Sequence, residues 1–348
     1  MIKIYHVLKG RFIFISSIWA FFLVFLTTLN GQDLHYSQFY NSPQNINPAL
    51  TGMFNGDHRI MVSMRDQWRF VPVPWFTLSG AYDRKLYVLK GEKHFLGVGA
   101  SLNHDRQGDS KLNLSSLNLN GAYHRIINAQ NIISAGIVIG FSSRGFNNRL
   151  LTWDKQWDGE VFNSNLPTGE SFSNLERVNF METGLGLNYR YQKNSRTFAD
   201  VGASVLHLLK PNSAFYNNDV ADLPRRVTLS GTGQIKLAKV FDIQLNFLHQ
   251  IQGKYNETIF GGLGKMYLSE KRGKEIQLHA GLGYRTAQSF IPSMAIQFNN
   301  VYVALSYDID TNQFNDIVNS NKGGPEIHVR YIIANVKPMK EMKVCPVY

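Results

Sequence analysis

Glycine pairs and histidines are the residues of this chain whose types could do chemistry. None of the Gly-x-Gly pairs is followed by the third glycine that a dinucleotide-binding turn requires. Gly264-Lys265 is followed by Met266 instead of Ser or Thr, which excludes a phosphate-binding P-loop. Because every pair lies inside a segment of alternating residues, we interpret these glycines as small residues lining a barrel lumen. The pairs are 97/99, 184/186, 231/233, 262/264 and 281/283.

The histidines and the single cysteine give no catalytic or metal-binding pattern. No two of the 10 His stand three or four residues apart, and no HExxH motif occurs. Cys345 is the 1 Cys of the chain, so an internal disulfide and a site of several thiolates are excluded. We therefore predict no catalytic residue, no cofactor and no metal. A Ser-His site assembled across strands is the enzymatic alternative.

The N-terminal residues 1–31 have the pattern of a secretory signal. Lys3, Lys9 and Arg11 precede an uncharged stretch over 12–29, and cleavage after Gly31 would make Gln32 the first mature residue. An uncleaved anchor helix is the alternative, since a stretch of this length barely reaches across a bilayer. Export of the mature chain is the expectation.

The positive charge does not indicate nucleic acid as a partner. Without the three basic residues of the signal, 36 Lys+Arg fall to 33 against 25 Asp+Glu, which leaves +8. The basic residues are scattered singly, and an exported protein does not meet the genome. We assign the charge to loops and a lumen that meet acidic or sugar-rich surfaces.

Segments of about ten residues with alternating apolar and polar side chains recur along the mature chain, as membrane β-strands do. They predict 14 strands, an even number. In the segment 111–125 the apolar phase switches at Ser115-Ser116, which predicts a β-bulge. The predicted strands begin at residues 60, 76, 96 and 111 and continue with 131–143, 180–191, 197–207, 226–236, 241–250, 257–268, 275–285, 290–298, 301–309 and 326–334.

The alternation favours a membrane barrel over a secreted β-sandwich or soluble barrel. Segment 275–285 carries Leu278 and Leu282 on one face and Gln277 and Arg285 on the other, which suits an apolar exterior and a wet lumen. Aromatic residues also gather at segment ends, where a membrane girdle would lie. The predicted girdle consists of Trp75, Phe76, Tyr123, Tyr189, Tyr191, Tyr284, Tyr302 and Tyr331.

The connections differ strongly in length. Tight links occur at 271–274 and 299–300, whereas 145–178 and 208–224 are long and contain prolines. Membrane barrels of this class place short turns in the periplasm and long loops outside. The long loops are therefore candidates for partner contact, through Trp153, Trp157, Pro211 and Asn212, with solvated loops without a role as the alternative.

Motifs spread over the mature chain resemble the PorP/SprF family of type IX secretion outer-membrane proteins. The opening reads QDLHYSQFYNSP from Gln32 and is followed by INPALTG from Ile46. The resemblance implies a role in type IX secretion, with a secreted adhesin or the motor and translocon as partner. It continues in RDQW from Arg65, AYD from Ala81, HL at His207, KPN from Lys210, LPRR from Leu223, SYD from Ser306, GPEI from Gly324 and CP at Cys345.

The opening segment 32–56 reads as a non-strand element. Pro43 and Pro48 each remove a ladder donor, and Asn47 and Gly52 favour turns. Two compatible roles remain open: aromatic and apolar residues plug the periplasmic mouth, or the segment docks a periplasmic or translocon component. The docking candidates are Gln38, Phe39, Tyr40, Asn47 and Pro48.

Together these patterns predict an all-β protein, a transmembrane antiparallel β-barrel of about 14 strands with a short N-terminal plug or periplasmic segment. The expected organisation is a signal peptide 1–31, the segment 32–56, a barrel 57–334 and a tail 335–348. The resemblance implies a non-enzymatic outer-membrane component that supports export or surface anchoring of a partner protein, and the barrel would be in contact with outer-membrane lipid. A pore for small solutes is the alternative.

Overall fold

The computed structural model describes residues 33–67, 74–86, 93–147, 151–169, 177–215, 221–271, 273–286, 288–311 and 323–334. The predicted signal peptide, the tail with Cys345, and Gln32 lie outside these residues. From Leu34 onward the chain forms one compact unit. No helix in the described part is long and apolar enough to cross a membrane.

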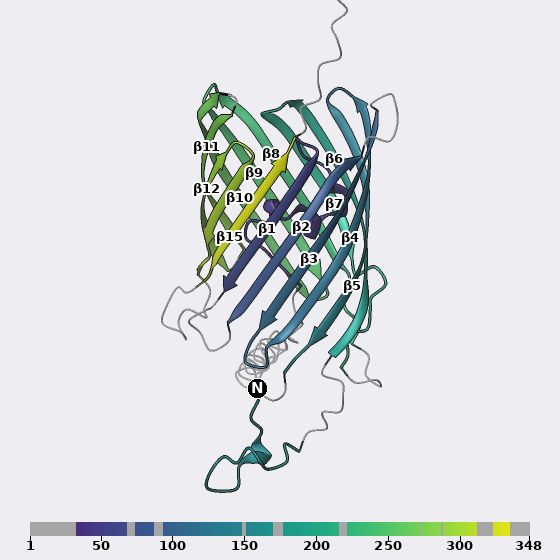
Figure 1. Cartoon of the computed structure of the whole chain (residues 1–348), viewed down its shortest axis with the longest axis vertical. Helices are drawn as coiled ribbons and strands as arrows, with labels where there is room; N and C mark the ends of the chain where they lie inside the picture. The colour runs from purple at the N-terminus through teal and green to yellow at the C-terminus, as the bar shows by residue number, and fades with distance from the viewer. Residues whose placement is uncertain are drawn as a thin grey trace, which may run out of the picture. The chain divides into compact units, whose positions relative to one another are not determined.

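The described residues form a closed antiparallel β-barrel (Figure 1). Consecutive strands pair from β1 to β13. β14 pairs with β12, and β15 pairs with β13 and with β1, which closes the ring. This confirms the predicted fold and strand number, because β13 and β14 together occupy one position. The strands are β1 (His58–Gln67), β2 (Trp75–Leu86), β3 (His94–Gln107), β4 (Leu112–Asn128), β5 (Asn131–Gly145), β6 (Arg177–Asn194), β7 (Thr197–Leu206), β8 (Arg226–Ala238), β9 (Phe241–Gln252), β10 (Tyr255–Lys271), β11 (Lys274–Arg285), β12 (Ser289–Phe298), β13 (Val301–Tyr307), β14 (Ile309–Asp310) and β15 (Pro325–Ile333).

The interruption between β13 and β14 has a cause in the sequence. β12 pairs with β13 up to Ser293 and with β14 from Phe290, so Pro292 lies at the gap. Proline has no N–H to donate to a ladder. Asp308, between the two strands, instead donates its backbone N–H to the carbonyl of Gly324 at 3.0 Å. Asp308 continues the inward-facing positions of β13, and its carboxylate is buried in the barrel.

The two faces of the wall follow the predicted alternation. Large apolar side chains such as Leu102, Leu119 and Leu187 are exposed on the outside, while the alternate positions are buried and mostly polar. An apolar exterior of this kind is compatible with contact to lipid. In lipid, all backbone N–H and C=O groups of the strands form hydrogen bonds only when the ring of strands is closed. The sequence pattern therefore arises because the solvent outside the barrel is apolar and the lumen is polar.

Three details of the sequence analysis were wrong. Strand β4 pairs without a register shift through Ser115-Ser116, and its irregularity falls between Ile126 and Asn128 instead. Tyr302 is buried at 4% exposure and faces the lumen, so it does not belong to the girdle. The glycines 231/233 and 262/264 share the parity of exposed apolar residues on β8 and β10 and so face outward. The phase of the neighbouring apolar residues assigns the face of these glycines, whereas a Gly-x-Gly pair by itself does not.

The two ends of the barrel differ in their connections. At one end, which we call the short-turn end, β4–β5, β6–β7, β8–β9, β10–β11 and β12–β13 are joined by links of about two residues. The connections β5–β6, β7–β8 and β14–β15 at the opposite, long-loop end are much longer. β1 begins and β15 ends at the short-turn end (Figure 1).

Segment 34–56 crosses the lumen from the long-loop end to the short-turn end (Figure 1). It folds as short helical turns, η1 (Phe39–Asn41), α2 (Pro43–Ile46) and η2 (Pro48–Leu50). Arg226, the first residue of β8, donates to the Leu34 carbonyl at 3.2 Å, whereas Gly52 donates to Asp83 near the opposite end. The prolines begin the turns because their fixed φ suits a first helical position.

Candidate functional site

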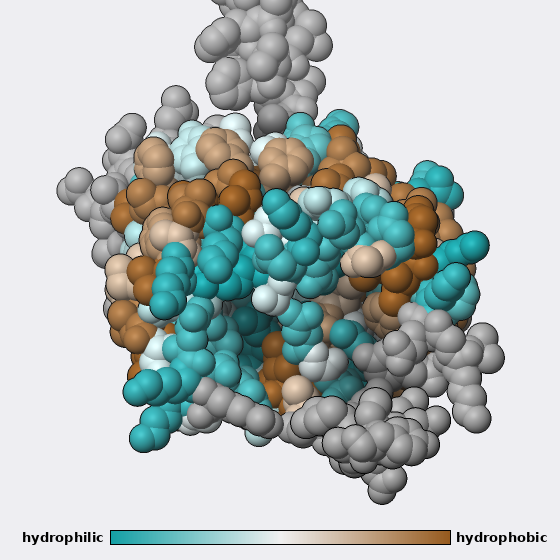
Figure 2. Space-filling model, turned by 90° about the horizontal axis from the view of Figure 1, so that it is seen from above, coloured by the Kyte–Doolittle hydropathy of each residue, from teal (hydrophilic) through white to brown (hydrophobic). Residues whose placement is uncertain are grey.

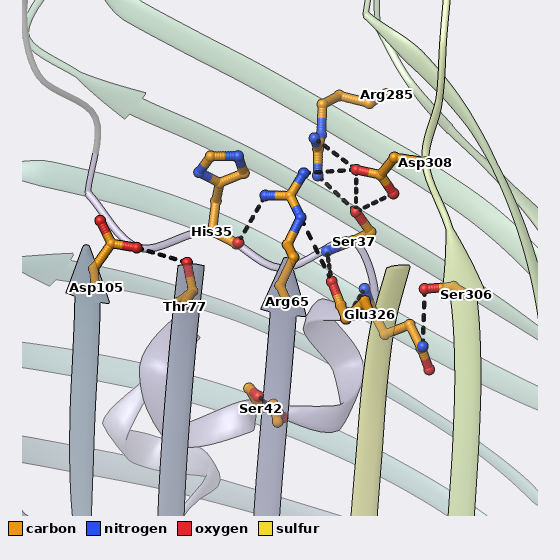
Figure 3. A network of polar contacts seen from close by, with 12 residues as sticks. His35, Ser37, Ser42, Arg65, Thr77, Asp105, Arg285, Ser306, Asp308 and Glu326 are labelled. Atoms are coloured by element: carbon orange, nitrogen blue, oxygen red, sulfur yellow. Dashed lines mark hydrogen bonds and ion pairs between the residues drawn. The ribbon is translucent and has the colours of Figure 1, made fainter. Parts of the chain in front are cut away.

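Five residues fasten segment 34–56 to the wall near the long-loop end, and we call them the latch: Ser37, Arg65, Arg285, Asp308 and Glu326 (Figure 3). Arg65 Nη2 lies 2.6 Å from Asp308 Oδ2, and the Ser37 hydroxyl donates to the same carboxylate at 2.6 Å. Glu326 accepts the backbone N–H of Ser37 at 2.7 Å. All five are at most 4% exposed. A carboxylate and guanidinium taken out of water need such partners to remain charged.

Arg285 connects the latch to a third carboxylate, that of Glu257. Its Nη2 donates to the Ser37 hydroxyl at 2.9 Å, its Nη1 lies 3.3 Å from Asp308, and its Nε lies 2.9 Å from Glu257. Arg65 lies on β1 at the beginning of the barrel sequence, whereas β10, β11 and β15, which supply other groups, lie toward its end. The latch therefore forms only when the barrel has closed.

The predicted docking residues Gln38, Phe39 and Tyr40 contact the chain's own barrel. Gln38 is 1% exposed, and its amide donates to Ser306 Oγ at 2.9 Å. Phe39 packs in an apolar cluster, and Tyr40 is half-buried with its ring 5.6 Å from that of Phe39. The other cluster members are Ile46, Leu248, Ile259 and Ile291.

Asn47 and Pro48 are also buried, where the segment presses against glycines of the wall. The Asn47 amide donates to the Leu187 carbonyl at 2.9 Å, and its oxygen accepts the N–H of Ala49 at 2.9 Å. A Cβ added to Gly136 would lie 2.3 Å from the Ala49 nitrogen. Only a glycine lets two backbones approach this closely. The contacts occupy these residues inside the protein and favour the plug interpretation of the segment.

Part of the β5–β6 connection forms a small ordered structure of its own. Gln156, in η4 (Asp154–Gln156), is 6% exposed, and its amide donates to the carbonyls of Ser164 and Leu166. The Trp153 N–H donates to the Gln156 side chain at 3.1 Å. The Asp158 carboxylate accepts the N–H groups of Glu160 and Val161, both at 2.9 Å, and these bonds lower the pKa of Asp158.

The tip of this loop presents apolar side chains to solvent. Trp157 and Phe162 form an isolated antiparallel bridge and are 57% and 46% exposed. Val161, between them in the turn, is 59% exposed. A cluster of exposed apolar groups on an ordered loop is typical of a binding surface. We call Trp157, Val161 and Phe162 the loop tip.

The remaining two predicted residues lie in the β7–β8 connection. Pro211 is half-buried, and its carbonyl accepts the N–H of Leu223 at 2.9 Å. Asn212 is exposed, and its side chain accepts the N–H groups of Ala214 and Ala221. These contacts give both residues a role in shaping the loop.

The predicted site residues thus fall into two groups. The structure brings Gln38, Phe39, Tyr40, Asn47 and Pro48 together in the lumen, and it places Trp153, Trp157, Pro211 and Asn212 in the long loops. The sequence analysis did not single out the latch residues. Its motifs nevertheless contained Arg65, Asp308 and Glu326, and charged residues at lumen-facing positions of several strands are the signal that could have identified them.

Among the described residues, no group of three His, Cys, Asp or Glu side chains could hold a metal ion. The buried charges of the latch are matched to one another and to the backbone of segment 34–56. Such an arrangement holds a segment in place.

Comparison with known proteins identifies the group to which this barrel belongs. The model of the PorP/SprF family, described as type IX secretion system membrane protein PorP/SprF, matches residues 28–331. The chain belongs to the PorP/SprF family. The expected resemblance is thereby confirmed over nearly the whole chain. No curated protein matches it.

Solved structures resemble this PorP/SprF chain only in outline. The CymD monoaromatic hydrocarbon channel has a TM-score of 0.49 at 10% identity, covering 85% of this chain and 94% of that one. A Pseudomonas aeruginosa FadL homologue has a TM-score of 0.46 at 9% identity, covering 82% and 92%. The β domain of the Bordetella autotransporter BrkA has a TM-score of 0.37 at 10% identity, covering 81% and 100%.

Proposed function

We propose that this PorP/SprF barrel is a non-enzymatic outer-membrane component of type IX secretion that supports export or surface anchoring of a partner protein. The observation that carries the proposal is the family match over residues 28–331 in a barrel whose lumen is occupied by its own segment 34–56. Residues 1–31 act as the export signal. The short-turn end faces the periplasm and the long-loop end faces outward, as in other outer-membrane barrels.

In this role the barrel is a rigid support and the loop tip contacts the partner. The turn at Asp158 and the buried Gln156 hold the loop in one conformation, so little conformational entropy is lost on binding. Aromatic residues that are ordered before binding are typical anchors of protein interfaces. The β7–β8 loop, with exposed Leu209, provides a second contact area. If substitutions in these loops leave partner binding unchanged, the alternative of solvated loops without a role is favoured.

The test is affinity purification of the tagged protein from detergent-solubilised outer membranes, followed by mass spectrometry. We expect a translocon barrel or a secreted surface protein to copurify. The amount of that partner that copurifies should fall at least about tenfold in the double variant Trp157→Ala/Phe162→Ala, because central aromatic anchors carry much of the binding energy of an interface. Glu160→Ala, in the same loop, is the matched control, and Leu209→Ala reports on the second loop.

A solute pore remains the competing function. It predicts that the purified wild-type barrel has no partner and conducts stably in planar bilayers. Segment 34–56 argues against this because it fills part of the lumen and is fastened at both ends. A partnerless barrel with a stable open conductance would replace the secretion proposal by the pore.

A further inference from the structure

A cavity of about 380 Å³ lies in the lumen between segment 34–56 and the wall. Its lining from the wall comes from the middle and the short-turn halves of the strands, as with Arg59, Lys265, Gln297 and Arg330. Figure 2 shows the hollow at the centre of the barrel, viewed from above, where hydrophilic side chains surround it. The cavity is therefore separate from the latch and the loop tip.

A continuous row of side chains crosses one wall of the cavity. The strand registers pair Tyr267 with Gln277, Gln277 with Gln297, Gln297 with Tyr302 and Tyr302 with Arg330. All five line the cavity. The row places two amides and a guanidinium, with aromatic rings beside them, on one surface.

Some of the positive side chains that line the cavity form ion pairs with carboxylates, and others do not. Arg59 and Arg190 form ion pairs with Asp83 at 2.6 Å and with Asp200 at 3.5 Å. Lys265, in contrast, donates to the neutral amide of Gln234 at 2.7 Å.

Arg330 lies over the Tyr302 ring, with its Cζ 4.4 Å from the ring centroid. Neither Arg330 nor Lys265 forms an ion pair with a carboxylate of the described residues. Asp242, which faces Lys265 across the strand pair, is bound by Arg196 and Tyr267, both at 2.7 Å.

The mouth of the cavity adds to this excess of positive charge. Exposed lysines outnumber exposed carboxylates along the short-turn ends of β6 and β8–β11, and Glu270 among the carboxylates is paired with Arg196 at 2.8 Å. Charges of one sign around a cleft raise the local concentration of the opposite ion. The exposed lysines are Lys193, Lys236, Lys239, Lys271 and Lys274.

We propose that this cavity binds a carboxylate, borne either by a small dicarboxylic acid or by an acidic peptide that enters from the short-turn end. Arg330 presents two parallel N–H groups to the carboxylate, and the Gln277 and Gln297 amides provide neutral donors beside it. Lys265 supplies the second positive charge. The rings of Tyr267 and Tyr302 pack against the apolar part of the ligand. Tyr40 closes the side formed by segment 34–56.

The proposal is tested by titration calorimetry on the full-length mature protein in detergent. The probes are glutarate and an acetylated Glu-Glu-Glu peptide, with glutaramide and an acetylated Gln-Gln-Gln peptide as neutral counterparts. We expect saturable binding of at least one charged probe and none of its neutral counterpart. Arg330→Gln and Lys265→Gln should each weaken binding about tenfold or more, because each removes one hydrogen-bond partner that is charged. Lys155→Gln, an exposed residue of the β5–β6 connection at the opposite end of the barrel and outside the cavity lining, should bind as the wild type does.

The outcomes separate the two sources. Binding of glutarate without the peptide identifies a small dicarboxylic acid, and binding of the peptide without glutarate identifies an acidic protein segment. The proposal is overturned if neither charged probe binds the wild type, or if the neutral probes bind equally well. Unchanged affinity of Arg330→Gln and Lys265→Gln, in barrels that keep their heat-modifiable migration, would overturn it as well.

Discussion

The guanidinium of Arg65 lies 2.6 Å from the carboxylate of Asp308, 243 residues away in the chain, and the Ser37 hydroxyl donates to the same carboxylate. One contact therefore joins the first strand, the break in the β13/β14 strand and the segment in the lumen. Asp308 faces inward because it continues the alternation of Ala304 and Ser306 on β13, and the ladder beside it is interrupted near Pro292. The latch thus lies beside an interruption in the sheet.

Removing one partner of this pair should destabilise the barrel. Arg65→Ala removes one of the positive charges that stabilise the buried carboxylate of Asp308. Loss of one partner of a buried ion pair typically lowers the free energy of unfolding by about 3–5 kcal/mol. We expect a lower urea midpoint for the loss of heat-modifiable migration on gels. Asp109→Asn, in the exposed β3–β4 turn, should leave the midpoint unchanged. Equal midpoints for Arg65→Ala and the wild type would mean that the latch does not contribute to stability.

A side chain at Gly136 should displace segment 34–56 and open the lumen. Gly136→Val places a Cβ 2.3 Å from the Ala49 nitrogen, where only backbone atoms could give way. In planar bilayers the variant should show more frequent or larger conductance steps than the wild type. The matched control is Gly121→Val on β4, where a Cβ meets nothing closer than Ile137 at 3.8 Å. Identical conductance of the two variants would count against the plug.

Cysteines at Ser42 and Ser63 should lock the segment to β1. Their hydroxyl oxygens are 2.9 Å apart, a separation that suits a disulfide between the two side chains. In a Cys345→Ser background we expect the Ser42→Cys/Ser63→Cys protein to oxidise without added crosslinker. Non-reducing mass spectrometry after proteolysis would detect the linked peptides. The control Ser42→Cys/Ser115→Cys, which combines the segment with β4, should give no linked peptides. If Ser42→Cys/Ser63→Cys gives no linked peptides either, the segment does not lie beside β1.

The loop tip should keep its conformation down to acidic pH. Two backbone N–H donors lower the pKa of Asp158, so its stabilising effect is complete above the ordinary Asp value of about 3.9. The effect is lost as pH falls through the lowered value. Limited proteolysis of the loop at graded pH would measure this. The amide oxygen of Asp158→Asn accepts the same hydrogen bonds but does not titrate, so the acid sensitivity of the loop should disappear in this variant. If the sensitivity persists, another group causes it.

Much of the fold could be predicted from the sequence because strand alternation is a local property. The recurring apolar and polar positions, the even number of segments and the unequal connections together indicated a membrane barrel of the observed size. The motifs also indicated the family. Residue type was misleading at Tyr302 and at the glycines of β8 and β10, because the alternation of their strands places Tyr302 on the inner face and these glycines on the outer face.

The sequence by itself determined the barrel, the non-strand opening and the long loops, since each follows from period, proline and glycine positions. Only the tertiary structure decided where segment 34–56 lies and what fastens it. The latch joins residues from Ser37 to Glu326, and the cavity row joins Tyr267 to Arg330 across five strands. Such contacts depend on ring closure and strand register, which bring distant side chains to one surface and which no local pattern specifies.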